Sequence, residues 1–337
     1  MIRILCTGDS HTWGQGTEGL EKEFDPAWVG GELRLTGFEA GSYVNRLRRM
    51  VNAATGSSAR EWTARDISRM TNIGFEAPCA LLDGEIELSF EGELVRIEFG
   101  MAQEASAAEI LIDGGFSGEW DLQSERTINA WKLATLHPGK GRHVLTVRAK
   151  KGLVRLFRIE VYEGACAVIN SGIGSCPAER LRTDFWKDYV EAVQPDIVLM
   201  EAHTINDWLT GETPEEHCRI LRRLMADVRQ MGAEPVLMTV APIGGDQILP
   251  GLAAEYDRFV EAGRRAARLE SVRLCDANAL MKIMISGMNE RQTSDYLLAD
   301  NWHPNDRGHA VYAQLLYEAL ASEKWFMEME EKIDENR

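Results

Sequence analysis

The feature that most constrains the fold is a regular alternation of two kinds of segment after residue 164. Short apolar runs typical of buried strands lie at residues 165–171, 196–202, 234–242 and 271–277. Longer stretches with apolar residues at helical spacing lie at about residues 178–193, 214–231, 252–269 and 306–321. Strands that alternate with helices in this way pair in parallel, with helices on both faces of the sheet. The apolar run at residues 2–7 adds a fifth strand, so the sequence predicts an α/β fold around a five-stranded parallel sheet.

Residues 57–164 have a different pattern. Apolar and polar residues alternate with a period of two, and glycine-rich turns separate the alternating stretches. This pattern is typical of short antiparallel strands and predicts a β-sandwich inserted into the α/β fold. We therefore predict a discontinuous α/β domain of residues 1–56 and 165–325, an inserted β-sandwich domain of residues 57–164, and a charged C-terminal tail at 326–337.

The charge of the chain argues against two classes of partner. Its 337 residues carry a formal net charge of -16, from 53 acidic and 37 basic side chains. A surface this acidic opposes binding to nucleic acid and to anionic membranes. No run approaches the ~20 apolar residues that a membrane-spanning helix needs. The charge thus predicts no nucleic acid and no membrane, is compatible with a small-molecule or oligosaccharide partner, and leaves a homo-oligomer open.

The six cysteines indicate a compartment rather than a metal site. No two of them form a Cys-x-x-Cys pair, and none has metal-ligand spacing to a histidine. The first residues resemble a strand rather than a secretory leader. These observations predict a cytoplasmic protein with reduced thiols and no metal.

Polar side chains gather where the predicted strands end. Four short segments follow a strand or precede the last helix: Gly8-Asp9-Ser10, Asn170-Ser171-Gly172, Asn206-Asp207 and Asp300-x-x-His303. Ligands of parallel sheets bind outside the carboxyl ends of the strands. We therefore expect these segments to meet at one edge of the sheet.

The first of these segments has two interpretations. Gly, Asp and Ser are common in turns that have no catalytic role. A serine hydroxyl becomes a nucleophile, however, when a base takes its proton and a carboxylate orients that base. His303 and Asp300 offer these two groups, and the N–H groups of Ser10 and Gly172 with the Asn206 amide are candidate donors to an oxyanion. The combination favours catalysis by Ser10 over a simple turn.

The four segments, in this order, resemble those of the SGNH (GDSL-type) hydrolases. The resemblance implies a flavodoxin-like three-layer α/β/α fold. It also implies a reaction that needs no metal or cofactor. It implies Ser10 as the nucleophile, His303 as general base and acid, and Asp300 as the residue that orients the histidine. It also implies an oxyanion hole formed by the N–H groups of Ser10 and Gly172 and the side chain of Asn206.

Two features go beyond the common pattern of this family. Thr204 stands where the third segment usually has glycine, and a β-branched residue there is expected to narrow the site or shift the Asn206 amide. The stretch ILIDGGFSGEWDL in the insert resembles part of the jelly-roll domain of one group of acetyl-xylan esterases. The insert is then expected to wall the active site or help seat a carbohydrate, and the alternative is a packing module.

The resemblance implies a serine esterase that removes a short acyl group, acetyl in the first place, from a saccharide. One alternative keeps the same residues but acts on longer chains, as a thioesterase or lysophospholipase. Another is a non-catalytic carbohydrate-binding protein. Trp13, Trp208 and Trp302 lie next to the predicted catalytic positions, where they either line the substrate pocket or pack loops onto the sheet.

Overall fold

A computed structural model gives the fold of the chain. The structure describes residues 1–17, 38, 40–76, 79–125, 131–244 and 252–328. The chain forms two compact units. Residues 57–167 belong to the first, and residues 2–17, 40–56 and 168–328 belong to the second, as far as they are described. The predicted domain boundaries, with the tail that extends beyond the described residues, stay a prediction.

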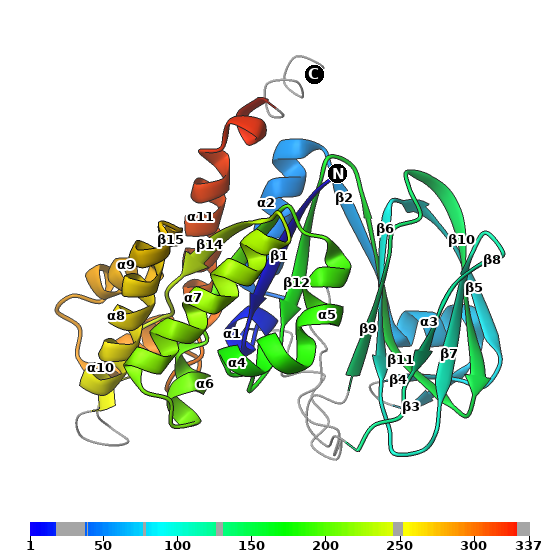
Figure 1. Ribbon diagram of the computed structural model, residues 1–337, viewed down its shortest axis with the longest axis horizontal. Helices are drawn as coiled ribbons and strands as arrows, with labels where there is room; N and C mark the ends of the chain where they lie inside the picture. The colour runs from blue at the N-terminus through cyan, green and yellow to red at the C-terminus, as the bar shows by residue number, and fades with distance from the viewer. Residues whose placement is uncertain (18–37, 39, 77–78, 126–130, 245–251, 329–337) are drawn as a thin grey trace. The chain divides into compact units, whose positions relative to one another are not determined.

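The second unit is built on the predicted parallel sheet (Figure 1). Its strands are β1 (Ile2–Gly8), β12 (Cys166–Gly172), β13 (Ile197–Glu201), β14 (Glu234–Met238) and β15 (Arg273–Cys275). They pair in the order β12-β1-β13-β14-β15. The first strand of the chain thus lies between the second and the third, which is the flavodoxin-like order. The predicted fold class is confirmed, and its topological switch point lies at the carboxyl ends of β1, β12 and β13.

Helices of this unit pack in pairs. The long ones are α2 (Tyr43–Thr55), α7 (Pro214–Gln230), α8 (Leu252–Glu270) and α11 (Asp306–Ala321), and α7 packs against α8 while α2 packs against α11. Shorter helices are α1 (Ser10–Trp13), α6 (Thr204–Leu209), α9 (Ala277–Met284) and α10 (Glu290–Leu297). None of the described helices is long and apolar enough to cross a membrane.

The helix predicted at 178–193 is wrong as a single element. It consists of α4 (Ala178–Arg180), a π-helical turn (Leu181–Phe185), α5 (Trp186–Tyr189) and a 3-10 turn (Glu191–Val193). Leu181, Phe185 and Tyr189 are buried at spacings of four residues. That spacing drifts around an α-helix of 3.6 residues per turn. A wider π turn keeps the three side chains on the buried face but interrupts the regular α-helical hydrogen bonds.

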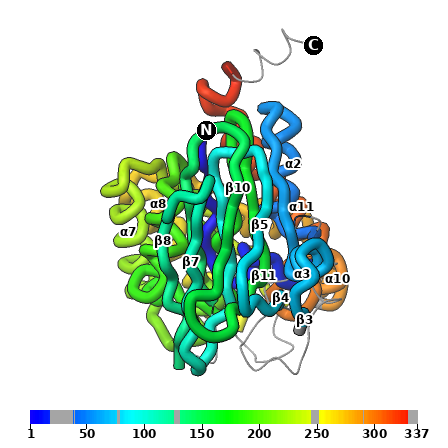
Figure 2. The backbone as a smooth tube through the Cα atoms, turned by 90° about the vertical axis from the view of Figure 1, so that its right-hand side faces the viewer, coloured from blue at the N-terminus to red at the C-terminus, as the bar shows by residue number. Residues whose placement is uncertain are grey.

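The first unit is an antiparallel β-sandwich, as predicted. One sheet has the order β5-β10-β7-β8, and the other has the order β3-β4-β11-β6-β9 with β2 paired to β11. Figure 2 looks onto the first sheet. The strands are β2 (Ser58–Thr63), β3 (Gly74–Glu76), β4 (Cys79–Leu82), β5 (Glu85–Gly92), β6 (Leu94–Gly100), β7 (Ala107–Ile112), β8 (Gly115–Asp121), β9 (Trp131–Leu136), β10 (Gly141–Lys151) and β11 (Val154–Glu163), with helix α3 (Ala64–Thr71) after β2. A jelly-roll connection of these strands stays a prediction.

The sandwich core lies between the two sheets. Along β5, Ile86, Leu88 and Phe90 are buried while the glutamates and serine between them are exposed. This alternation is what a period of two produces when one face of a strand is covered. Trp62 and Ile159 of the other sheet belong to the same buried cluster.

Candidate active site

Ser10 stands at the turn from the first strand into a helix. β1 ends at Gly8, and Asp9 caps helix α1 by accepting a hydrogen bond from the His11 N–H at 2.9 Å. The cap fixes the start of the helix, since a helix leaves its first N–H groups without backbone acceptors. Ser10 is therefore held at the carboxyl end of β1, with 4% of its surface exposed.

Asp300 and His303 are brought together by a turn before α11. One carboxylate oxygen of Asp300 accepts hydrogen bonds from the backbone N–H groups of Trp302 at 2.9 Å and His303 at 2.7 Å. The other accepts from Nδ1 of His303 at 2.6 Å. Burial raises the pKa of Asp300, but these hydrogen bonds and the histidine charge outweigh it and bring the pKa to about 2. The carboxylate is thus ionised at neutral pH.

Ser10 and His303 meet although 293 residues separate them. The Oγ atom of Ser10 lies 2.9 Å from Nε2 of His303. Because Nδ1 of His303 donates to Asp300, Nε2 is the nitrogen without a proton in the neutral ring and accepts from the serine hydroxyl. This arrangement can take a proton from Ser10 and stabilise the resulting imidazolium.

Asn206 reaches the same site from helix α6. One N–H of its amide donates to a carboxylate oxygen of Asp9 at 2.7 Å. An amide nitrogen carries two N–H groups, so the second is available to a ligand. Thr204 occupies the first turn of α6 and is buried, while the left-handed backbone conformation falls on His203, with φ of 52°. With Thr204 in place, the Asn206 amide bonds Asp9 next to Ser10, and the expected effect of Thr204 on the pocket stays a prediction.

Gly172 is placed differently from the expectation. Its N–H donates to the side-chain oxygen of Asn170 at 2.9 Å, so it is occupied within its own turn. A Cβ atom at Gly172 would overlap the backbone of Thr12 and Trp13. The glycine lets the end of β12 approach the loop after β1, which is a packing role. The prediction that the Gly172 N–H points to an oxyanion is not supported by this geometry.

Two buried acids, Asp9 and Glu201, stabilise the turn that carries Ser10. Glu201 ends β13, and its carboxyl oxygens accept the backbone N–H groups of Asp9 at 2.8 Å and His203 at 2.7 Å. Burial, then the charge of Asp9, raises the pKa of Glu201 well above its ordinary value. Burial also raises the pKa of Asp9, but His11 and His203, with hydrogen bonds, lower it further than burial raises it. The two shifts favour a proton on Glu201 and the anion on Asp9.

His11 is a further buried residue of this cluster. Its ring lies edge-on to that of His303, with centroids 5.5 Å apart. Burial lowers the pKa of His11 to about 4, so the ring is neutral at neutral pH. The sequence analysis missed His11 and Glu201, although an ionisable residue inside or next to an apolar run is a signal that can be used.

Asp9, His11 and Glu201 together could also be considered as metal ligands. Their donor atoms lie within 4.8 Å of one another. The carboxylate oxygens of Asp9 and Glu201 already accept hydrogen bonds from protein N–H groups, however. The trio fits a hydrogen-bonded support for the turn better than it fits an open coordination site.

The three tryptophans differ in exposure. Trp13 is 3% exposed and belongs to the core. Trp208 and Trp302 are partly buried, and both pack against one apolar cluster that includes Ile205 and Tyr256. The ring of Trp302 is also in edge contact with His303, at a centroid distance of 6.4 Å. Packing thus accounts for all three, and their role as pocket walls stays a prediction.

The fold and this site define a hydrolase of carboxylic esters. A family model described as the GDSL-like lipase/acylhydrolase family matches residues 148–311. This match to just under half of the chain supports an SGNH-type hydrolase that acts on carboxylic esters. The result is evidence against the alternative of a non-catalytic carbohydrate-binding protein.

The chain is similar to several solved structures. One titled as a peptidoglycan O-acetylesterase matches with a TM-score of 0.53 and 14% identity, over 95% of this chain and 90% of that one. LAE5, an α/β hydrolase from the metagenome of Lake Arreo, matches with a TM-score of 0.46 and 15% identity, over 94% of each chain. The acetylxylan esterase Axe2 of Geobacillus stearothermophilus matches with a TM-score of 0.40 and 20% identity, over 47% of this chain and 74% of that one. No curated protein has a matching sequence.

Proposed function

We propose that the protein is a serine esterase that removes short acyl groups, acetyl in the first place, from a saccharide. The observation that carries the proposal is the continuous chain from Ser10 through His303 to Asp300, with distances of 2.9 and 2.6 Å. The slight exposure of Ser10 and His303, 4% and 6%, favours a small acyl group. A protein of similar fold, described as a peptidoglycan O-acetylesterase, supports a saccharide as the alcohol.

The reaction follows from the roles of the three side chains. Ser10 Oγ attacks the ester carbonyl while His303 Nε2 takes the hydroxyl proton, and Asp300 stabilises the imidazolium. The backbone N–H of Ser10 and the second N–H of Asn206 donate to the oxyanion. His303 then gives the proton to the departing sugar hydroxyl. Water attacks the acyl-enzyme as His303 takes its proton, and His303 then returns this proton to Ser10 Oγ as the bond to the acyl group breaks and the carboxylic acid leaves.

The nucleophile is tested without knowledge of the natural substrate. A serine-directed organophosphonate is expected to label Ser10, which mass spectrometry of the digested protein locates. Ser10→Ala is expected to abolish turnover of p-nitrophenyl acetate, because loss of such a serine removes several orders of magnitude in kcat. Retained turnover, or label on another serine, contradicts the assignment.

The acyl group and the alcohol need separate measurements. Rates with acetyl, octanoyl and palmitoyl p-nitrophenyl esters distinguish the esterase from a long-chain hydrolase, since we expect the rate to fall as the chain lengthens. A steady rise contradicts the short-acyl proposal. Release of acetate from a panel of acetylated oligosaccharides then tests the sugar, and no release from any of them contradicts it.

We also propose that the protein works in the cytoplasm. All six of its cysteines are buried thiols. Reduced cysteines are usual where cellular thiols keep disulfides from forming. Fractionation of the producing cells with an immunoblot of each fraction tests this, and recovery from the secreted fraction contradicts it.

A further inference from the structure

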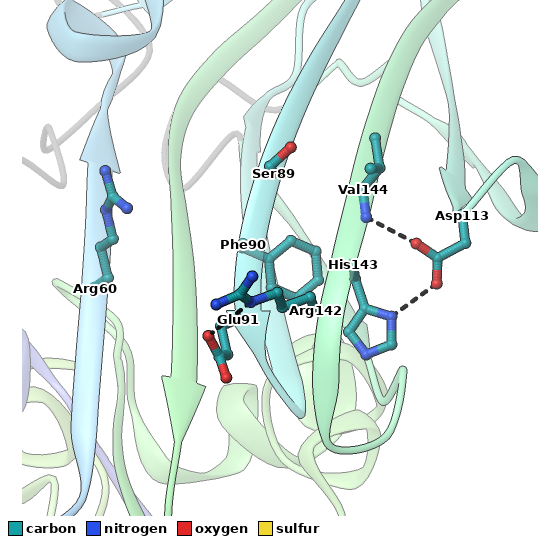
Figure 3. A pocket seen from close by; sticks show the side chains of 8 residues that line it. All are labelled: Arg60, Ser89, Phe90, Glu91, Asp113, Arg142, His143 and Val144. Atoms are coloured by element: carbon teal, nitrogen blue, oxygen red, sulfur yellow. Dashed lines mark hydrogen bonds and ion pairs between the residues drawn. The ribbon is translucent and has the colours of Figure 1, made fainter.

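The β-sandwich carries a hollow between strand β2 of one sheet and the paired strands β5 and β10 of the other. Its volume is about 500 Å³, which is within the range of sites for small ligands. Figure 3 shows Arg60 on one side and Phe90, Glu91, Arg142 and His143 on the other. A second hollow of about 170 Å³ shares Arg60, Phe90 and Glu91 with the first. We call the two together the sandwich hollow.

Arg60 is exposed on β2 and lies next to the buried Trp62 on the same face of the strand. Side chains two residues apart on a strand share a face. Trp62 belongs to the sandwich core and is 3% exposed. The guanidinium carbon of Arg60 lies 4.3 Å from the centroid of the Trp62 ring. Val161, which pairs with Arg60 in register, is buried on the same side. An exposed guanidinium thus lies against the edge of the buried sandwich core.

Other charged groups of the hollow already have partners. Nε of Arg142 lies 3.3 Å from the carboxylate of Glu91. Nδ1 of His143 lies 2.7 Å from the carboxylate of Asp113, as Figure 3 shows, and its Nε2 lies 3.1 Å from the carbonyl oxygen of Gly139. These groups fix the wall of the hollow and leave little binding capacity of their own.

Two donors of the hollow, one exposed and one buried, have no protein acceptor among the described residues. Within the described part of the chain, the guanidinium of Arg60 forms no ion pair, and its contact is with the Trp62 ring. The indole Nε1 of Trp62, which lines the smaller hollow, is buried and has no hydrogen-bond partner. A buried donor without an acceptor costs about 1–3 kcal/mol of stability, so it calls for a function.

A carboxylate is the acceptor that these donors fit. The planar guanidinium bonds a carboxylate through two parallel hydrogen bonds. The rim also carries Glu163, which accepts only a long hydrogen bond of 3.4 Å from Ser58, and the paired acids Glu91 and Asp113. These acids repel a ligand with several negative charges, but they accept hydrogen bonds from hydroxyl groups. A ligand with a single carboxylate and several hydroxyl groups limits this repulsion and can donate hydrogen bonds to the acids.

We propose that the sandwich hollow is a binding site for an acidic saccharide, with the sugar carboxylate on Arg60 and sugar hydroxyls on Glu163. A peptide rich in acidic side chains offers the same carboxylate but few hydroxyl donors, and the acids of the rim oppose it. The site is separate in chemistry from the ester hydrolysis of Ser10, and it adds a ligand class that the esterase reaction does not require.

The test measures binding in a chain that cannot turn over its ligand. Isothermal titration calorimetry of full-length Ser10→Ala uses a galacturonic acid trisaccharide, the corresponding galactose trisaccharide and triglutamate as probes. We expect the acidic trisaccharide to bind at least about tenfold more tightly than the other two, and less tightly as salt is added. Equal binding of the acidic and neutral sugars, tighter binding of triglutamate, or no binding at all overturns the proposal.

Variants in the same background locate the site. Arg60→Gln is expected to weaken binding of the acidic trisaccharide about tenfold, because it removes one charge-assisted carboxylate contact. Trp62→Phe, which keeps an aromatic ring but removes the N–H, is expected to weaken it about threefold. The matched control is Arg69→Gln, an exposed arginine of α3 outside the hollow, which is expected to change nothing. An equal effect of Arg60→Gln and Arg69→Gln overturns the proposal.

Failure of this proposal and failure of the proposed esterase are distinguishable. The calorimetry does not depend on hydrolysis, and p-nitrophenyl acetate turnover by the chain with Ser10 intact does not depend on Arg60. If acetate is released but no variant alters saccharide binding, the esterase stands and the hollow is not the site. If binding follows Arg60 while Ser10 is not labelled, the binding site stands and the catalytic assignment is wrong.

Discussion

The edge of the parallel sheet and the sandwich hollow both collect polar side chains, but in opposite states. At the sheet edge, Ser10, His303 and Asp300 are hydrogen-bonded to one another, and Asn206 is held by Asp9. In the hollow, by contrast, two donors have no acceptor among the described residues. The difference separates two uses of a polar group: groups already fixed by their neighbours can act on a reacting atom at once, whereas unpaired donors are completed by a ligand.

The largest effect on catalysis is expected from substitution of His303, which contacts both Ser10 and Asp300. His303→Ala should lower kcat for p-nitrophenyl acetate by about 10⁶-fold, and adding Ser10→Ala should cost little more, because residues of one catalytic unit are not additive. Steady-state kinetics of both single variants and the double variant check this. His137→Ala, an exposed histidine of the sandwich, is the control. Multiplicative losses contradict a shared unit.

A smaller loss is expected at Asp300. Asp300→Asn should lower kcat by about 10³–10⁴-fold, because the amide no longer holds the histidine in the reactive tautomer. The kinetic assay with p-nitrophenyl acetate measures it, and Asp295→Asn on α10 is a control of equal charge change. If Asp300→Asn matches Asp295→Asn, the carboxylate has no part in the reaction.

The oxyanion donors give a sharper test of the geometry. Asn206→Ala should lower kcat by about 10²-fold, with little change in KM, since the amide is expected to bond the transition state. Thermal unfolding of the variant shows whether loss of the hydrogen bond to Asp9 has disturbed the turn. A well-folded variant with unchanged kcat would remove Asn206 from the reaction.

Low pH is expected to lower the stability of the α/β unit, because this unit contains buried histidines. The pKa values of His11 and His309 fall to about 4 and about 3, both mainly through burial. Because the folded values lie below the ordinary value of 6.5, the unfolded chain binds protons more readily, and stability falls as the pH drops from about 6.5 toward 4. Each histidine accounts for roughly 3 kcal/mol or more.

Denaturant unfolding at a series of pH values checks this expectation. The slope of the unfolding free energy with pH should approach that of two protons in this range, and His11→Gln should reduce it toward one. A free energy of unfolding that stays flat between about pH 6.5 and 4 contradicts the burial of neutral histidines in this unit.

The smallest effect tests the independence of the two regions. Arg60→Gln is expected to leave the kinetics of p-nitrophenyl acetate hydrolysis unchanged, because the ester of a small phenol needs no contact in the hollow. A large fall in kcat for this substrate is evidence that the two regions do not work as separate sites.

Much of the fold was predictable because its signals are local. The apolar run at residues 2–7 and the four later runs have the length of buried strands, and the period-two alternation of β5 marks a half-covered strand. The helix at 178–193 was not predictable as it stands, because the spacing of Leu181, Phe185 and Tyr189 gains meaning only when all three meet a core. Local spacing showed an amphipathic segment, and packing decided its pitch.

The sequence by itself determined which reactive groups exist and where they stand: Ser10 and Asn206 after strands, and Asp300 and His303 before the last helix. Only the tertiary structure decided which of them touch, and it gave Gly172 a packing role because its N–H is used by Asn170. The same holds for the pKa values of Glu201 and His11, which depend on burial among groups distant in sequence. The physical reason is that hydrogen bonds and desolvation depend on distance in space. The pattern along the chain indicates only on which face of a helix or strand each residue lies.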